Sequence, residues 1–161
     1  MNPPKIITLP KTTLVGMHQK MSRANDKTAQ LWQGFMPRRK EIKGAELDSF
    51  YSVNIYPSNY NPATFLPTNE FVKWAAAKVE GESEIPDGME HLIIPEGNYA
   101  VFQHKGSMPK FIENIMFIFN EWLPNSAFEL DNRPHFELLP ANYPGPMDPN
   151  SEEEIWVPVY S

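Results

Sequence analysis

The chain has no cysteine among its 161 residues, which excludes disulfide bridges, thiolate metal sites and a cysteine nucleophile. Long apolar runs are also missing, because no stretch approaches the roughly 20 consecutive apolar residues that cross a bilayer. The N-terminus, Met1-Asn2-Pro3-Pro4-Lys5, lacks the apolar core and the small-residue cleavage site of a secretory signal. Together these absences predict a cytoplasmic protein that does not enter a membrane.

Basic residues are scarce over most of the chain. Residues 1–43 carry nine Lys and Arg against Asp26 and Glu41, whereas the remaining residues carry five against 18 acids. Nucleic-acid binding requires cations that neutralise phosphates, so this acidic majority argues against direct nucleic-acid binding. The cluster Arg38-Arg39-Lys40 follows a predicted helix and is interpreted as an ordinary solvated face.

Motifs for common catalytic and metal-binding machineries are absent from the sequence. Gly106-Ser107 alone does not make a phosphate loop, and no Gly-x-Ser-x-Gly elbow occurs. The run 152–154 of three glutamates lacks the alternating ligands of a calcium loop and is interpreted as a solvated acidic edge. His18 and His104 occupy corresponding positions but find no third ligand with suitable spacing, which favours hydrogen-bonding roles. The sequence therefore predicts no metal and no cofactor.

Apolar periodicity predicts two helices and six strands. The first helix is expected to begin near Asn25-Asp26 and to present one apolar face made of Leu31, Trp32, Phe35 and Met36. The second begins near Ser107, with Pro109 in its first turn, and carries the stripe Phe111, Ile112, Ile115, Met116, Phe119, Trp122 and Leu123. Strands are predicted at 13–20, 50–56, 71–79, 99–104, 135–139 and 154–159. The Pro- and Asn-rich segments 57–67 and 140–149 are expected to be exposed connections, the second able to act as a flap.

The order strand, helix, strand, strand occurs twice, in halves at about residues 5–80 and 90–160. Val15-Gly16-Met17-His18 precedes the first helix as Val101-Phe102-Gln103-His104 precedes the second, and the two histidines lie 86 residues apart. One such unit cannot bury both its sheet and its helix, so the halves are expected to pack about a pseudo-twofold axis. The predicted fold is one α+β domain over residues 1–161, a duplicated βαββ unit with antiparallel sheets and two main helices.

Three stretches of the second half carry a family resemblance: Gly97–Ser107, Glu121–Glu137 and Glu154–Val159. In order and spacing they resemble the GyrI-like (gyrase-inhibitor-like) effector-binding domains of AraC- and MerR-type transcription regulators. The first half matches only in outline, through the helix with Leu31-Trp32. The resemblance implies a ligand cleft between the two repeats. Many relatives carry a DNA-binding region ahead of this domain, and because the first strand begins near residue 13 the chain is expected to be a stand-alone member.

The resemblance implies that Glu137 reaches into the cleft and anchors cationic or polar aromatic ligands. A carboxylate in an apolar pocket is desolvated, and a bound cation offsets that cost. The alternative is a solvent-facing strand glutamate between Phe136 and Leu138. Relatives often have a tyrosine two positions later, where this chain has Leu139. Four strand aromatics are candidates to line the cleft, with a core role equally open to each: Tyr56, Trp74, Tyr99 and Trp156.

The predicted function is binding of a small lipophilic aromatic ligand, cationic or neutral, in this cleft. Two alternatives stay open. The first is a hydrolase of electrophilic drug-like compounds, in which Glu137 acts as general base with Tyr99 as its partner. The second is a protein partner, such as a regulator or a topoisomerase that the acidic protein protects.

Overall fold

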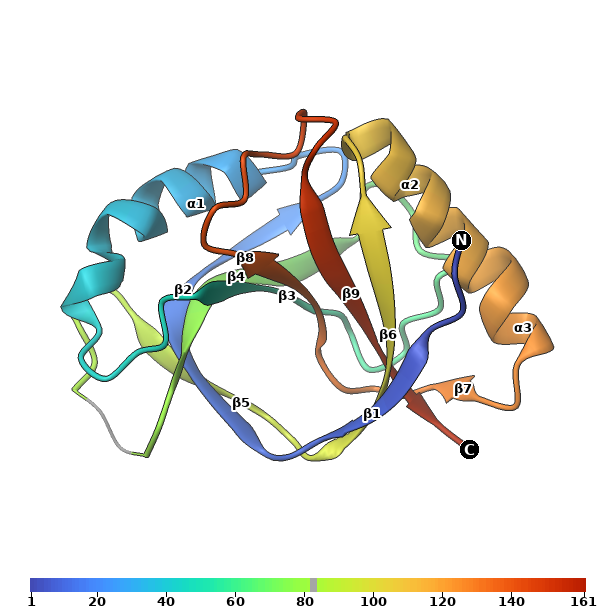
Figure 1. Ribbon diagram of the computed structural model, residues 1–161, viewed down its shortest axis with the longest axis horizontal. Coiled ribbons are helices and arrows are strands. Elements are labelled where there is room, and N and C mark those ends of the chain that lie inside the picture. Colours follow the sequence, from blue (N-terminus) through green and yellow to red (C-terminus); the bar gives the residue numbers. More distant parts are fainter. Residues whose placement is uncertain (82–83) are drawn as a thin grey trace.

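Strands from both halves of the chain form one curled antiparallel sheet in the computed structural model, which describes residues 1–81 and 84–161 (Figure 1). The strand order is β1-β6-β9-β8-β3-β4-β2-β5, with β7 beside β9. The strands are β1 (Lys5–Leu9), β2 (Thr12–Ser22), β3 (Ser49–Ile55), β4 (Glu70–Val79), β5 (Glu90–Ile94), β6 (Gly97–Lys105), β7 (Glu129–Leu130), β8 (His135–Pro140) and β9 (Glu152–Tyr160).

The strand order is symmetric about the β8–β3 pair, with equivalent strands of the two halves on either side. In the first half β2, β4 and β3 lie side by side, and in the second half β6, β9 and β8 do the same. The halves meet where β3 pairs with β8, with Ser52 opposite Glu137. The edge strands are exchanged, because β1 of the first half pairs with β6 and β5 pairs with β2. The chain therefore has the predicted α+β fold of a duplicated βαββ unit, in which the two units share one sheet.

Two helical segments cover one face of the sheet. The first, α1 (Thr28–Phe35), lies over β2 and β4 and continues into the 3-10 turn η1 (Met36–Glu41). The second, α2 (Met108–Phe117), lies over β6 and continues through the π-type turn η2 (Ile118–Trp122) into α3 (Leu123–Asn125). Within the described ranges, no helix combines the length and the apolarity needed to cross a bilayer.

The helix starts agree only in part with the sequence prediction. The second helix begins after Ser107 and holds Pro109 in its first turn, as predicted. The first begins two residues later than Asp26, because the Asp26 carboxylate accepts the Thr28 backbone N–H at 2.9 Å in a turn that precedes the helix. The first helix therefore starts near Asn25-Asp26, as predicted, although Lys27 is the residue that directly precedes it.

The predicted apolar stripe on the second helix is also partly wrong. Ile112 and Met116 are exposed at 51% and 57%, whereas Asn114 and Ile118 are buried. The buried Asn114 has a hydrogen-bond partner, because its side-chain amide lies 2.9 Å from His104 Nδ1.

All six predicted strands are present, and three further strands were not predicted. The missed strands β1, β5 and β7 span five, five and two residues. Ile6 on β1 and Ile93 on β5 are exposed at 43% and 49%, so these edge strands lack the two-sided burial that marks the central ones. Their pairing partners belong to the other half of the chain, which no local sequence signal reports.

Strand alternation divides the core between the two faces of the sheet. On the helix face, one cluster around Phe35 and Phe50 lies under α1 and another around Phe102 and Ile118 lies under α2. The opposite face holds a third cluster, which comprises Leu14, Tyr51, Val53, Trp74, Ala76, Ile94, Tyr99, Val101, Phe136 and Trp156. Between the two helix-face clusters, the middle of the sheet is covered by neither helix.

Candidate functional site

A cavity of about 450 Å³ opens above this uncovered middle of the sheet, between α1 and α2. The β8–β9 loop rises between the two helices in Figure 1, and its residues Tyr143, Gly145 and Pro146 line the rim. The walls are apolar side chains from both helical segments: Ala29, Trp32, Met36, Met108 and Phe111. The floor comes from the central strands and consists of Phe50, Ser52, Lys73, Glu137, Leu139 and Glu153.

Glu137 lies on the floor of the cavity. Its neighbours Phe136 and Leu138 point to the other face, where both pack in the third cluster. This alternation turns Glu137 toward the helices, and its accessible surface faces the cavity. No Lys, Arg or His nitrogen among the described residues lies within 4.0 Å of its carboxylate. Burial raises the pKa of Glu137, and the positive charge of Lys73 partly offsets that increase.

A second carboxylate, that of Glu153, lies on the same floor. Glu137 pairs with Ile155 across β8 and β9, so Glu153 is its diagonal neighbour on the same face, roughly 7 Å away between Cβ atoms. Burial, and then the charge of Glu137, raise the pKa of Glu153 to about 7. Glu153 is only 8% exposed, so the prediction that residues 152–154 form a solvated acidic edge is wrong at this position. At neutral pH the Glu153 carboxyl group is therefore charged in some molecules and neutral in others.

The floor also contains one lysine. Lys73 lies on β4, opposite Asn54 of β3, and its side chain is half-buried. In the described part of the chain, no carboxylate oxygen lies within 4.0 Å of its ammonium group. The acids of β8 and β9 thus occupy one side of the floor, and the cation of β4 occupies the other.

The two histidines that correspond in the repeats lie in different surroundings. His104 borders the cavity, where its Nε2 donates to the Gly106 carbonyl at 3.0 Å and its Nδ1 faces the Asn114 amide. Burial lowers the pKa of His104 and so favours the neutral ring. A neutral imidazole has one donor and one acceptor nitrogen, which matches these two contacts. His18 lies on the other face of its strand, stacked on Trp74 and 3.0 Å from Glu90. Both residues have the hydrogen-bonding surroundings that the sequence favoured.

Three of the four predicted aromatic residues lie away from this cavity. Trp74, Tyr99 and Trp156 are buried in the third cluster, on the face of the sheet that the helices do not cover. The Tyr99 hydroxyl donates to the Pro134 carbonyl at 2.7 Å, and burial raises the pKa of Tyr99. The arrangement therefore does not bring Tyr99 together with Glu137, the pairing that the hydrolase alternative expected.

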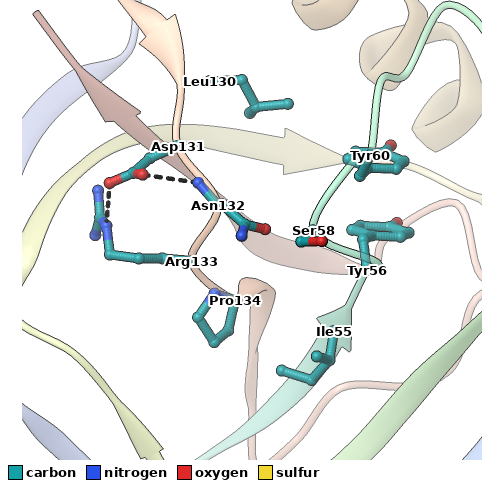
Figure 2. Close-up of a pocket in the computed structure, with 9 residues that line it drawn as sticks. All are labelled: Ile55, Tyr56, Ser58, Tyr60, Leu130, Asp131, Asn132, Arg133 and Pro134. Atoms are coloured by element: carbon teal, nitrogen blue, oxygen red, sulfur yellow. Dashed lines mark hydrogen bonds and ion pairs between the residues drawn. The ribbon is translucent and has the colours of Figure 1, made fainter.

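The fourth aromatic residue, Tyr56, lines a separate cavity of about 170 Å³ (Figure 2). Its ring stacks on that of Tyr60, with the centroids 3.9 Å apart. The far wall is the segment 130–134, in which the Arg133 Nε donates to Asp131 at 2.7 Å. Figure 2 shows the Arg133 guanidinium directed away from the two tyrosines. This cavity does not join Tyr56 to Glu137 in one site.

Several lining residues were not among the predicted site residues. Lys73 had a recognisable signal, since it is a charged residue inside the otherwise apolar strand 71–77. Glu153 and Tyr143 had none, because their position depends on the β8–β9 register and on the loop path. Trp32, Met36 and Phe111 were predicted as apolar helix residues. Their contact with the cavity depends on how the helices pack on the sheet, which the sequence does not show.

Comparison with known proteins identifies relatives along the whole chain. Residues 5–159 match the family model of Cass2, described as an integron-associated effector binding protein. The transcriptional regulator BrlR of Pseudomonas aeruginosa is 32% identical over 156 residues, which cover 97% of this chain and 55% of BrlR. The chain thus spans about half the length of that regulator.

Solved structures share the fold at lower sequence identity. SAV2435, solved bound to tetraphenylphosphonium, has a TM-score of 0.67 at 19% identity, covering 98% of this chain and 94% of that one. The C-terminal domain of EcmrR has a TM-score of 0.70 at 13% identity, covering 98% and 96%. An integron cassette protein of Vibrio cholerae has a TM-score of 0.62 at 15% identity, with the same coverage. These likenesses establish the fold alone.

Proposed function

The chain belongs to the Cass2 family of integron-associated effector-binding proteins, and we propose that it binds a lipophilic aromatic ligand with a positive charge between its two repeats. The GyrI-like resemblance of residues 97–159 is confirmed by the family match and by the relatives. In the proposal residues 1–161 act as one ligand-binding unit, with Glu137 as the polar anchor. The relative BrlR is a transcriptional regulator, and a regulatory protein partner for this chain is therefore part of the proposal.

The observation that carries the proposal is an unpaired carboxylate on the floor of an apolar cavity. The volume of about 450 Å³ lies within the roughly 300–1,000 Å³ typical of small-molecule sites. Trp32 and Phe111 offer flat apolar area on opposite walls, and Trp32 adds an aromatic face for a cation. A ligand cation placed near Glu137 offsets the desolvation that raises the pKa of this carboxyl group.

The experiment is a thermal-shift titration with tetraphenylphosphonium, the compound bound in the SAV2435 structure, together with a panel of cationic and neutral aromatic compounds. A ligand at 100 times its Kd adds about 2.7 kcal/mol to the free energy of unfolding, which raises the melting temperature visibly. We expect the cations to stabilise the wild type and to lose most of this effect in Glu137→Gln.

The matched control is Glu96→Gln, since Glu96 is exposed in the turn between β5 and β6 and does not line the cavity. It makes the same change of net charge outside the site. Stabilisation that survives in Glu137→Gln, or that is lost equally in Glu96→Gln, would contradict the proposed anchor. Absence of stabilisation by every cation of the panel would contradict the proposed function.

A further inference from the structure

We propose that the cavity selects amphoteric ligands, aromatic compounds that carry an anionic group beside their cationic centre, and that Lys73 binds the anion. This inference rests on the proposed function and names the class of ligand for that same site. Its basis is the distribution of charge on the cavity floor.

The described residues that line the cavity include three acids and one lysine. The acids are Asp26, Glu137 and Glu153, and the cation is Lys73. Asp26 lies at the rim, and its Oδ1 already accepts the Thr28 hydroxyl at 2.6 Å and the Thr28 N–H at 2.9 Å. The floor therefore contains a negative side at Glu137 and Glu153 and a positive side at Lys73.

Lys73 is half-buried and unpaired. On the same face of β4 its neighbours along the strand are the buried Phe71 and Ala75. Its ammonium group has no carboxylate within 4.0 Å among residues 1–81 and 84–161. The carboxylates of Glu137 and Glu153 attract this ammonium group only from a distance, and a ligand anion in the cavity would give it a partner in direct contact.

Strand register separates the two charged sides by the width of an aromatic ligand. Lys73 lies opposite Asn54 on β3, and Asn54 lies opposite His135 on β8, two residues before Glu137. The backbones of β4 and β8 are two strand spacings apart, which is roughly 10 Å. Glu153 lies one strand further away, on the far side of Glu137 from Lys73. A ligand cation over the two glutamates thus leaves room for an anion at Lys73 across a ring system.

A different role for Lys73 makes a different prediction. If Lys73 served only as a counter-ion to Glu137, its removal would strengthen the binding of every cationic ligand by the same factor. If Lys73 binds a ligand anion, its removal weakens only ligands that carry one. The ratio of affinities for two ligands that differ only in the anion separates these roles.

Rhodamine 110 and rhodamine 123 are such a pair, because they share the cationic xanthene and the second is the methyl ester of the first. Fluorescence anisotropy titrations at pH 7.5 measure both affinities for the wild type, Lys73→Met and Lys73→Arg. The matched control is Lys78→Met, on the same strand but outside the cavity, where Lys78 pairs with Glu80 at 3.9 Å. Urea unfolding of each variant verifies that it is folded.

We expect rhodamine 110 to bind the wild type at least as tightly as its ester. Lys73→Met should lower the ratio of the affinity for rhodamine 110 to that for rhodamine 123 about tenfold. This is the effect expected from the loss of one charge-assisted hydrogen bond. Lys73→Arg and Lys78→Met should leave the ratio unchanged. A ratio that Lys73→Met leaves unchanged overturns the inference, and if Glu137→Gln still weakens both dyes the proposed function stands. A wild type that binds neither dye nor any cation of the panel overturns both.

Discussion

Replacing Glu153 by glutamine removes a titratable carboxyl group from the cavity floor with little change of shape. Burial and the charge of Glu137 raise the pKa of Glu153 from its ordinary value of 4.5 to about 7 in the folded chain. The folded state thus holds this proton more tightly than the unfolded state does. Its stabilising effect is present below about pH 4.5 and is lost as the pH rises through about 7.

The difference between these two pKa values corresponds to about 3 kcal/mol in the free energy of unfolding. Because glutamine does not titrate, we expect Glu153→Gln to be more stable than the wild type by about 3 kcal/mol at pH 7.5. At pH 4.5 the two proteins should agree within about 0.5 kcal/mol, since both then carry a neutral side chain.

Urea unfolding at half-unit steps from pH 4.5 to 8 measures this difference directly. The control is Glu152→Gln, since Glu152 is exposed on the same strand and lies 3.7 Å from Lys105. Its stability difference from the wild type should change little over the same range. A difference for Glu153→Gln that is independent of pH, or a variant less stable than the wild type at pH 7.5, would refute the reasoning.

Three other substitutions test the packing and the boundary of the site. Gly16→Ala should destabilise by about 3 kcal/mol in urea unfolding, because its Cβ would overlap the Ala75 carbonyl and Ala76 on β4, and an unchanged midpoint would contradict this. Tyr99→Phe should lower the free energy of unfolding by about 1 kcal/mol, because it removes the hydrogen bond to Pro134, and should leave ligand affinity unchanged. A large loss of ligand affinity would instead show that Tyr99 belongs to the site. Trp32→Ala should weaken cation binding about tenfold in a fluorescence titration, and unchanged affinity would remove α1 from the cavity wall.

The fold could be predicted wherever its signals are local. The nearly continuous apolar residues of 71–79 and 99–104 indicate burial on both faces, and both segments are central strands. Pro109 after Ser107 marks a helix start within one turn, which requires no knowledge of the rest of the chain. The edge strands β1 and β5 lacked such signals because each is stabilised by pairing with the other repeat.

The candidate site could be predicted only in its centre. Glu137 could be expected on the helix side only from the GyrI-like resemblance, because strand alternation alone permits either face of the sheet. Lys73 and Glu153 meet Glu137 only through the registers of three strand pairs, and no sequence periodicity contains that information. The strand aromatics Trp74, Tyr99 and Trp156 are equally compatible with either face, and packing places them in the core opposite the helices.

Calorimetric titration of the wild type with tetraphenylphosphonium and tetraphenylborate, at pH 7.5, tests the central claim most directly. The two ions have nearly the same size and shape and opposite charge, so the comparison isolates the carboxylates of the cavity floor. We expect tetraphenylphosphonium to bind at one site per chain, at least tenfold more tightly than tetraphenylborate, with the gap reduced in Glu137→Gln. Equal affinities for the two ions, or tighter binding of the anion, would contradict the account.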